Sequence, residues 1–438
     1  MLTTLKNALK VKEIRTRVLF TFIMLIIIRI GSCLPVPGVD RTYFARWFAE
    51  QNSGTFTFLD QITGGSFMQM SILALNINPY ITSSIIIQLL TIAIPKLEEM
   101  QREGEVGRKK MVAITRYVTV GLAIIQSTAM SVGFGRQGLL NNYTWYNVIT
   151  CIVALTAGSA FLMWIGEQIT EHGIGNGISI VLIINILSRI PQDLGSLYEQ
   201  FVQGKAPATA VLSAIIIIAI MIGMIVMVVF LNGGERRIPV QYAKKMAGNK
   251  MVGGATSNIP LKVNTSGMIP IIFASSLLEF PVIIVSMIPN FSPSEFWAEI
   301  LKGLNSNNWC VPGQLKYSIG LLVYIALLIF FSYFYTSITF NPLMVADNLK
   351  RQGGFIPGIR PGKPTSDYLN SVLNYLIFIG AVGLVLVSVL PHVFNGVFGA
   401  KVSTSGASLI IIVSVILETL KQVESMMLVR NYKGFLND

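Results

Sequence analysis

The sequence is poor in the residues that soluble enzymes use for solubility and for chemistry. Charged residues make up 12% of the 438 positions, and the chain has only two histidines and three cysteines. Soluble domains carry about 25% charged residues, so this composition excludes an ordinary soluble protein. The cysteines are scattered without paired spacing, which argues against a disulfide framework or a zinc site built on them.

Motifs typical of catalysis are also missing. Residues 358–363, GIRPGK, are one residue short of a phosphate-binding loop, and no predicted strand precedes them. The glycines of EHGIGNGIS at 171–179 lack the strand–turn–helix setting of a dinucleotide site. His172 and His392 fall on opposite faces of the predicted membrane, and neither GxSxG nor HExxH occurs. We therefore expect no enzymatic activity, no cofactor and no metal.

Long apolar stretches dominate what is present. A hydrocarbon core about 30 Å thick requires roughly 20 apolar residues per helix. We therefore expect an all-α polytopic membrane protein of ten spans, and because ten is even, both ends lie on one side. The stretches cover 18–36, 72–95, 112–134, 148–169, 174–190, 208–231, 266–289, 316–340, 369–391 and 405–420.

The distribution of basic residues predicts which side that is. The N-terminal segment, the even-numbered connections and the C-terminal tail hold 23 of the 33 Lys and Arg, against eight in the opposite loops. Cytoplasmic loops carry this excess, so both termini and the basic loops are predicted to be cytoplasmic. The same rule explains most of the net charge of +12, which by itself would suggest nucleic-acid binding.

One segment between the first two stretches is too short to span and too apolar for an ordinary loop. It covers residues 55–70, TFTFLDQITGGSFMQM, and precedes a span that begins with polar residues and a proline. It forms either a re-entrant element covered by protein, or a small helix on the outer membrane face. The residues that mark it are Phe58, Leu59, Ile62, Gly64 and Gly65.

Two cytosolic connections, about 232–265 and 341–368, are long, cationic and rich in turn residues. Alternating Pro, Gly and apolar positions predict fixed turns, with Arg360 at a structured tip. These charges either only set the topology or form a docking surface for an anionic partner such as ribosomal RNA or an acidic protein face. We favour docking, because orientation alone needs no shaped loop. The basic residues are Arg236, Arg237, Lys244, Lys245, Lys350, Arg351 and Arg360.

Ionisable residues inside the spans are few. Arg29, Glu279 and Glu418 are the candidates, and an ion-coupled transporter would be expected to show more of them. Gln88 and Gln126 can hydrogen-bond between neighbouring helices. A secondary transporter for a small solute is one function that such a helix bundle could have, whereas an intramembrane enzyme would need a catalytic cluster that the sequence lacks.

Ordered motifs along the whole chain resemble the SecY/Sec61-alpha family of protein-secretion channels. Each motif is weak alone, but together, in order and on ten spans, they are highly specific. They are RIGS (29–32) with PVPG (35–38), NPYI (78–81) with IIIQLL (85–90), GEQITE (166–171) with GIGNGIS (173–179), RR (236–237) with YAK (242–244), PLKVN (260–264), and ADNLK (346–350) with PGIRPG (357–362).

The resemblance implies an hourglass pore between two inverted five-span halves, 1–190 and 191–438. Residues 55–70 would be the plug, and the second, third, seventh and eighth spans would form a lateral gate that includes Gln88 and Gln126. An apolar ring seals such a waist by dewetting. Carried onto this chain, the ring would be Ile77, Ile81, Ile178, Leu182, Ile272 and Ile411.

The resemblance also implies partners and a location. It predicts SecE-like and SecG-like membrane subunits, a SecA motor ATPase or a ribosome docked on the basic loops, signal-bearing polypeptide substrates, and contact with membrane lipids at the gate. The tail YKGF at 432–435 suits a bacterial cytoplasmic membrane protein. Two positions depart from the family pattern: Leu182 replaces the more usual isoleucine, and Glu279 stands where an apolar residue is usual.

Overall fold

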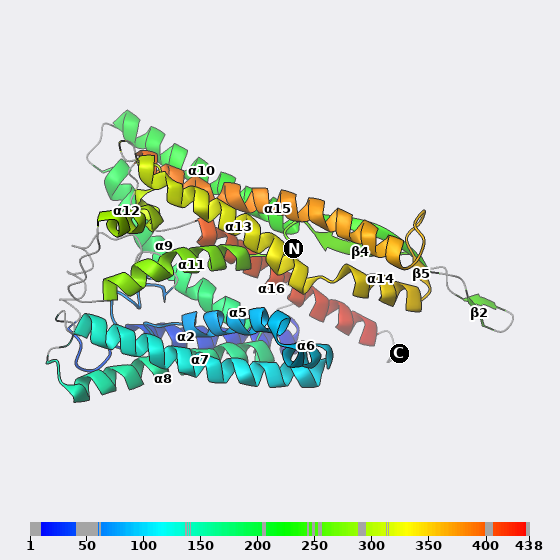
Figure 1. Cartoon of the computed structure of the whole chain (residues 1–438), viewed down its shortest axis with the longest axis horizontal. Coiled ribbons are helices and arrows are strands. Elements are labelled where there is room, and N and C mark those ends of the chain that lie inside the picture. The colour runs from blue at the N-terminus through cyan, green and yellow to red at the C-terminus, as the bar shows by residue number, and fades with distance from the viewer. Residues whose placement is uncertain are drawn as a thin grey trace.

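Helices make up most of the structure (Figure 1). The computed structural model describes residues 10–40, 60, 63–135, 138, 140, 142–203, 207–242, 245–247, 250–252, 256–287, 295–311, 313, 315–398 and 406–434. Its helices are α2 (Lys12–Cys33), α5 (Asn78–Ala93), α6 (Pro95–Arg102), α7 (Glu105–Phe134), α8 (Trp145–His172), α9 (Gly177–Phe201), α10 (Pro207–Gly233), α11 (Ile269–Met287), α12 (Glu295–Leu304), α13 (Ile319–Thr339), α14 (Pro342–Arg351), α15 (Lys363–Phe398) and α16 (Gly406–Gly434).

Each of the ten predicted apolar stretches falls on one of these helices, in chain order: α2, α5, α7, α8, α9, α10, α11, α13, α15 and α16. Within the described residues, seven helices are long and apolar enough to cross a membrane, and the pair α5 and α6, bent by 108°, would make an eighth. In α11 the described apolar helix covers Ile269–Leu278. The predicted all-helical membrane architecture is therefore confirmed.

The second span begins later than the sequence predicted. The apolar run starts near residue 72, but residues 72–77 form turns and α5 begins only at Asn78. Asn76 has a φ of 53°, which a regular helix does not tolerate. Pro79 then occupies the first turn of α5, where its missing N–H costs nothing. Hydrophobicity alone could not show this boundary, because both sides of it are apolar.

The helices form two groups with a diagonal set between them. In Figure 1, α2, α5, α7 and α8 lie together, α10, α13 and α15 lie together, and α9, α11 and α16 run between the groups. Close packing of α8 on α9 depends on glycine: a Cβ at Gly177 would lie 1.9 Å from the carbonyl oxygen of Gly166. Small residues permit this approach where lipid supplies no hydrophobic driving force between helices.

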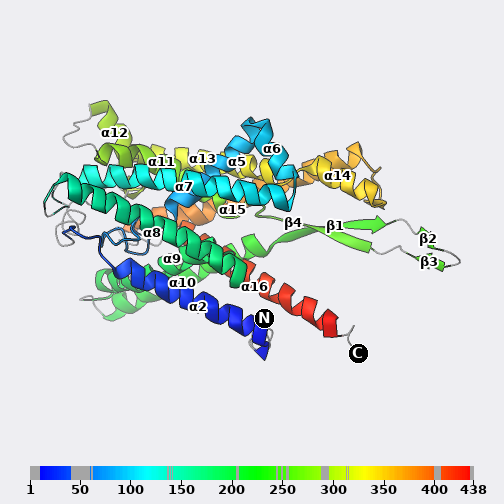
Figure 2. The same cartoon turned by 90° about the horizontal axis from the view of Figure 1, so that it is seen from below.

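Strands occur at one end of the molecule, which we call the sheet end; the opposite end is the outer end. β1 (Glu235–Tyr242) pairs antiparallel with β4 (Thr256–Lys262) and with β5 (Gly354–Phe355), in the order β4-β1-β5. β2 (Lys245–Ala247) and β3 (Lys250–Val252) form a second, two-stranded sheet. Both chain ends lie toward the sheet end (Figure 2), as an even number of spans requires.

Candidate functional site

The six residues expected to form the apolar ring come from four elements that converge between the two helix groups. Ile77 and Ile81 lie at the start of α5, Ile178 and Leu182 at the start of α9, Ile272 on α11, and Ile411 on α16. Leu182, Ile272 and Ile411 are buried in one cluster. Ile77 and Ile178 belong to the adjoining cluster, and Ile81 packs against both.

Local spacing brings the ring residues together in pairs. Ile178 and Leu182 are four residues apart on α9 and share a helix face. Ile77 precedes α5, and the hydrogen bond from the N–H of Ile81 to its carbonyl oxygen (3.0 Å) holds these two residues in a similar relation. Asn176 fixes the start of α9, because its side-chain oxygen accepts hydrogen bonds from the N–H groups of Ile178 (3.1 Å) and Ser179 (3.4 Å). The two clusters are largely aliphatic, so this junction offers few side chains that form hydrogen bonds.

The segment before α5 crosses this region on the side of the outer end. Phe58, Leu59 and Ile62 lie outside the described residues, whereas Asp60 and residues 63–76 are described. Phe67 and Met70 are buried in an apolar cluster with α7 and α8. The segment is thus covered by protein, which supports a re-entrant element over a helix resting on the membrane face.

Polar contacts fix the start of this segment to α9. The Asp60 carboxylate is fully buried, and its Oδ2 lies 2.8 Å from Nη1 of Arg189. Asp60 Oδ1 accepts a hydrogen bond from the N–H of Met68 (3.0 Å). Ser188 Oγ donates to the carbonyl oxygen of Gly64 (3.3 Å). Such a buried pair is sensitive to the loss of either partner, because the other charge is left uncompensated.

Gly64 and Gly65 have a structural reason to be glycine. Their φ values are 66° and 85°, a region that other residues rarely adopt. A Cβ at Gly64 would lie 2.6 Å from the carbonyl oxygen of Asn185 on α9. Two glycines therefore allow the segment to turn and to approach α9 at backbone contact.

Sequence reasoning missed the Asp60–Arg189 pair and a second ion pair on the same half. Arg116 on α7 donates to Glu167 Oε1 on α8 at 2.7 Å. Two features of the sequence could have pointed to the first pair: Asp60 in an otherwise apolar segment, and Arg189 at the end of an apolar run. Pairing them requires the fold, because each partner is more than 50 residues from the other in the chain.

The two glutamines expected on the lateral gate are not brought together. Gln88 is on α5 and Gln126 on α7, and these helices pack side by side. Ser83 Oγ donates to the carbonyl oxygen of Thr115 at 2.8 Å, which sets the register of the pair. Gln88 lies five residues toward the sheet end and Gln126 eleven residues toward the outer end, so they are about 24 Å apart along the helices. Ser83 and Thr115 make the contact instead.

The ionisable residues expected within the spans differ in their surroundings. Arg29 on α2 is half-buried, and its Nη1 has no hydrogen-bond partner within the described part of the chain. Glu418 on α16 is exposed. The side chain of Glu279 lies outside the described residues.

The two cationic connections form one folded unit at the sheet end. Ile238 and Val240 of β1 are buried against Leu261 of β4, Leu349 of α14 and Ile356. The β1–β4 register runs from Glu235 opposite Lys262 to Gln241 opposite Thr256. Strand β5 then joins the second connection to the first.

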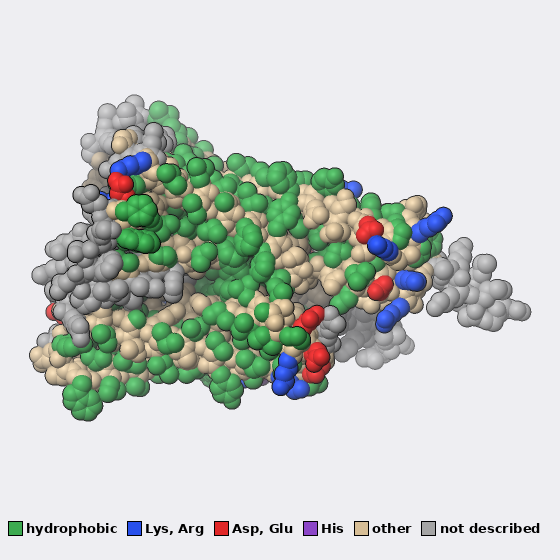
Figure 3. All heavy atoms as spheres, viewed as in Figure 1, with side chains coloured by type: hydrophobic (Ala, Val, Ile, Leu, Met, Phe, Trp, Pro, Cys, Tyr) green, Lys and Arg blue, Asp and Glu red, His purple; other side chains and the backbone are tan. Residues whose placement is uncertain are grey.

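Basic side chains cover the outside of this unit, and Figure 3 shows Lys and Arg gathered toward its end of the molecule. Arg236, Arg237, Lys350, Arg351 and Arg360 are exposed. Thr365 Oγ1 donates to the carbonyl oxygen of Arg360 at 2.8 Å and so fixes the tip. Lys244 and the side chain of Lys245 lie outside the described residues.

An ion pair fixes the base of β1 to the last helix. Nζ of Lys421 on α16 lies 2.9 Å from Oε1 of Glu235. The hydrogen bond from Lys421 holds the pKa of Glu235 below its usual value, with smaller contributions from Arg237 and Lys262. The basic unit is therefore connected directly to α16, which also carries Ile411.

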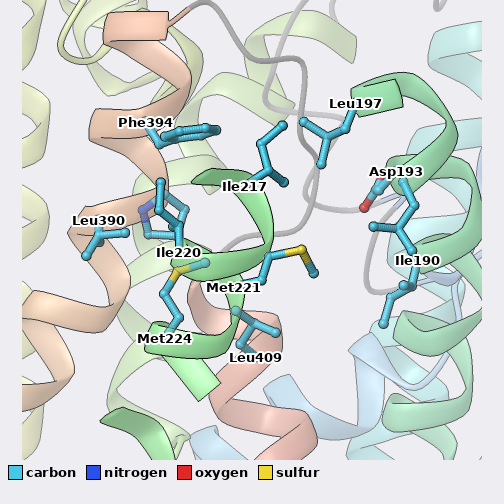
Figure 4. A pocket seen from close by; sticks show the side chains of 12 residues that line it. Ile190, Asp193, Leu197, Ile217, Ile220, Met221, Met224, Leu390, Phe394 and Leu409 are labelled. Atoms are coloured by element: carbon cyan, nitrogen blue, oxygen red, sulfur yellow. The ribbon is translucent and has the colours of Figure 1, made fainter. Parts of the chain in front are cut away.

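A small cavity lies between α9, α10, α15 and α16, where the two helix groups meet (Figure 4). Its volume is about 60 Å³, close to that of two water molecules. The lining is apolar except for the buried Asp193. It comprises Ile190, Asp193, Leu194, Leu197, Ile217, Ile220, Met221, Met224, Leu390, Pro391, Phe394 and Leu409. The cavity provides space at the junction but no set of reactive groups.

Comparison with known proteins decides the family. The SecY family model matches residues 71–420. The chain belongs to the SecY family. It is 43% identical to the protein translocase subunit SecY of Streptomyces scabiei and 42% identical to that of Bacillus subtilis, with 100% of both chains covered in each case.

Solved channel structures share the fold of this SecY-family chain. A protein-conducting channel matches with a TM-score of 0.60 at 18% identity, covering 95% of this chain and 93% of the other. Sec61 in a canine ribosome–channel complex from the endoplasmic reticulum matches with a TM-score of 0.59 at 16% identity, with the same coverage. At these identities the likeness establishes the architecture and not the roles of single residues.

Proposed function

We propose that polypeptides cross this SecY-family channel through the constriction formed by Ile77, Ile81, Ile178, Leu182, Ile272 and Ile411. As a family member the chain is a translocase channel subunit and not an enzyme. The observation that carries the assignment is the convergence of these six aliphatic residues from α5, α9, α11 and α16 between the two helix groups. An apolar waist excludes water and ions when closed and releases a moving chain readily.

In this proposal the segment 55–70 is the plug, and it closes the outer side of the waist. Its buried position over α7, α8 and α9 supports that role. The plug of a related SecY stabilises the closed state of its channel and maintains a membrane seal. Displacement of the segment would break the contact of Asp60 with Arg189 before the aliphatic ring opens.

The lateral gate in this proposal lies between α5 and α7 of one half and α11 and α13 of the other. The chain then divides into halves at about residue 190, at the end of the fifth span. A signal sequence is a short apolar helix, so partition into lipid stabilises it at such an opening. Gln88 and Gln126 would face this path at different depths, nearer the sheet end and nearer the outer end respectively.

The sheet end is the proposed cytosolic docking surface for a SecA-like motor or a translating ribosome. Its support is the packed β4-β1-β5 sheet that carries exposed Arg236, Arg237, Lys350, Arg351 and Arg360. The excess of Lys and Arg in the loops at this end supports a cytoplasmic location in a bacterial membrane protein. SecE-like and SecG-like subunits would complete the complex.

A site-specific photo-crosslinker at Ile81 tests the route. A signal-bearing polypeptide is stalled part-way across membranes that contain the complete complex. Ile81 should crosslink to the stalled chain, whereas Val153, exposed on α8, should not. Confirmed transfer without an Ile81 crosslink would overturn the ring assignment, and no transfer with all partners present would overturn the proposed function.

A further inference from the structure

Helix α12 lies at the outer end and has two chemically different sides. Its sequence is EFWAEILKGL, in ten residues. At 100° per residue, Phe296, Trp297, Ile300, Leu301 and Leu304 share one side, while Glu295, Glu299 and Lys302 share the other. This pattern is typical of a helix that lies at a boundary between an apolar phase and water.

The last turn of α12 is fixed to α13. Trp309 Nε1 donates to the carbonyl oxygen of Gly303 at 2.8 Å, and a Cβ at Gly320 of α13 would lie 1.9 Å from that same oxygen. Leu304 packs against the apolar core that α13 shares with α11 and α15. These contacts fix the end of α12 relative to the start of α13.

The first turn of α12 presents aromatic side chains that the protein leaves uncovered. Phe296 is 70% exposed and Trp297 is 58% exposed, with their rings in edge contact 6.1 Å apart. Removal of such large apolar side chains from water is favourable. Two of them together on the apolar side of a fixed helix indicate an apolar partner.

The surrounding surface identifies that partner as lipid. At the start of α13, next to the turn that holds α12, Ile319 and Leu322 are exposed on the membrane-spanning surface. Helix α12 packs against the start of α13 and the turn before it, so the aromatic pair lies near a surface that spans the membrane. On the other helix group, Trp145 and Tyr146 are exposed at the outer-end start of α8. Trp and Tyr concentrate where a membrane meets water, and both groups then contribute to one such belt.

We propose that α12 is an interfacial helix that inserts Phe296 and Trp297 into the lipid leaflet at the outer end and anchors α13 there. Its polar side, where Glu299 pairs with Lys316, faces water. Because α12 is fixed to α13, the outer end of α13 is held at the depth of the lipid headgroups. This inference concerns the membrane contact alone and does not depend on the route proposed for polypeptides.

Photo-crosslinking to lipid tests the proposal in the full chain, reconstituted with its partner subunits in phosphatidylcholine–phosphatidylglycerol vesicles. A benzophenone side chain is placed at Trp297 or, as the matched control, at Lys302 on the polar side of the same helix. Lipid adducts are counted by mass spectrometry. We expect severalfold more lipid adduct at 297 than at 302, because only the side chain at 297 is placed among the acyl chains in this proposal. Equal yields, or adducts at 297 only with protein, would overturn the proposal.

A second measurement avoids the large replacement side chain. Vesicles containing lipids brominated near the headgroup quench nearby tryptophans, and the difference between the parent and Trp297→Phe isolates Trp297. Trp164, exposed on α8, serves as the lipid-facing reference through Trp164→Phe. Quenching of Trp297 at least as strong as that of Trp164 supports insertion. A Trp297 signal unchanged by bromine, with an unchanged melting temperature, would contradict it.

Discussion

Two loop regions of this channel are built on different principles. The segment 60–66 contacts α9 through polar groups: the Asp60–Arg189 pair and the hydrogen bond from Ser188 to Gly64. The sheet end instead has an apolar core of its own, with Ile238 and Val240 buried beneath the strands. One region is fastened by a few directional contacts, and the other by packing distributed over many side chains.

The difference indicates which region is suited to move. A directional polar contact is lost completely once its geometry changes, and it reforms when the geometry returns. Apolar packing resists displacement over a larger area and suits a surface that must keep its shape while a partner pushes on it. The start of the proposed plug, residues 60 and 63–66, thus has contacts that suit a part that moves, although Phe67 and Met70 at its end are packed in an apolar cluster. The proposed docking surface has packing that suits a part that keeps its shape.

The largest expected effect comes from breaking the polar contact on one side. Arg189→Leu leaves the buried Asp60 carboxylate without its partner, at a cost of about 3–5 kcal/mol to the closed arrangement. We expect the segment to leave α9 and the vesicles to leak ions in the absence of substrate. Ion conductance of the reconstituted complex measures this.

Exchanging the two charges distinguishes loss of the Asp60–Arg189 ion pair from a general loss of folding. Asp60→Arg combined with Arg189→Asp restores opposite charges and should recover part of the seal. Lys316→Ala, which removes an exposed ion pair with Glu299 at the same end, serves as the control and should leave conductance unchanged. If the Arg189→Leu channel conducts no more ions than the parent, the Asp60–Arg189 pair does not stabilise the closed state.

The second-largest effect is expected from a substitution in the apolar core of the sheet end. Ile238→Ala opens a cavity in the core of the sheet end and should cost about 2–3 kcal/mol locally. Limited proteolysis of the β1–β4 hairpin should become faster, while the resting conductance stays at the parent level. Leakage from this variant would mean that the two regions are not separate.

Reversal of one exposed charge should have a smaller effect that is limited to docking. Arg360→Glu changes a surface side chain on a fixed tip, so stability should change by less than about 0.5 kcal/mol. Affinity for a SecA-like motor or ribosome should fall about tenfold, through the loss of charge complementarity. Binding measured at two salt concentrations tests this, and Lys302→Glu, an exposed reversal of the same sign at the outer end, is the matched control.

The sequence was sufficient for the order of the helices but not for the contacts between them. Hydrophobic runs place α7, α8 and α13 because each run is long and uninterrupted. They did not place the start of α5, because the turns at 72–77 are as apolar as the helix that follows. Backbone angles, such as the positive φ of Asn76, decide that boundary.

The candidate site also combines features that the sequence predicts with contacts that it does not predict. Ile178 and Leu182 share a helix face by spacing alone, but the contact of Leu182 with Ile272 and Ile411 depends on the crossing of α9, α11 and α16. The Asp60–Arg189 pair joins positions 129 residues apart, and no local pattern relates them. The family motifs predicted the ring residues, whereas the Asp60–Arg189 pair was found only in the three-dimensional structure.

The smallest expected effect is a pH dependence of the stability of β1, at the base of the sheet end. Because Lys421 lowers the pKa of Glu235 relative to the unfolded chain, the pair stabilises β1 above the ordinary glutamate pKa. That contribution, below about 1 kcal/mol for a partly exposed pair, is lost as the pH falls through the folded-state value. The hydrogen-exchange protection factors of β1, which are corrected for the intrinsic effect of pH on exchange, should therefore fall on acidification in the parent. They should fall less in Lys421→Ala, which has already lost the pair. Identical pH profiles would show that packing alone fixes the base of the sheet.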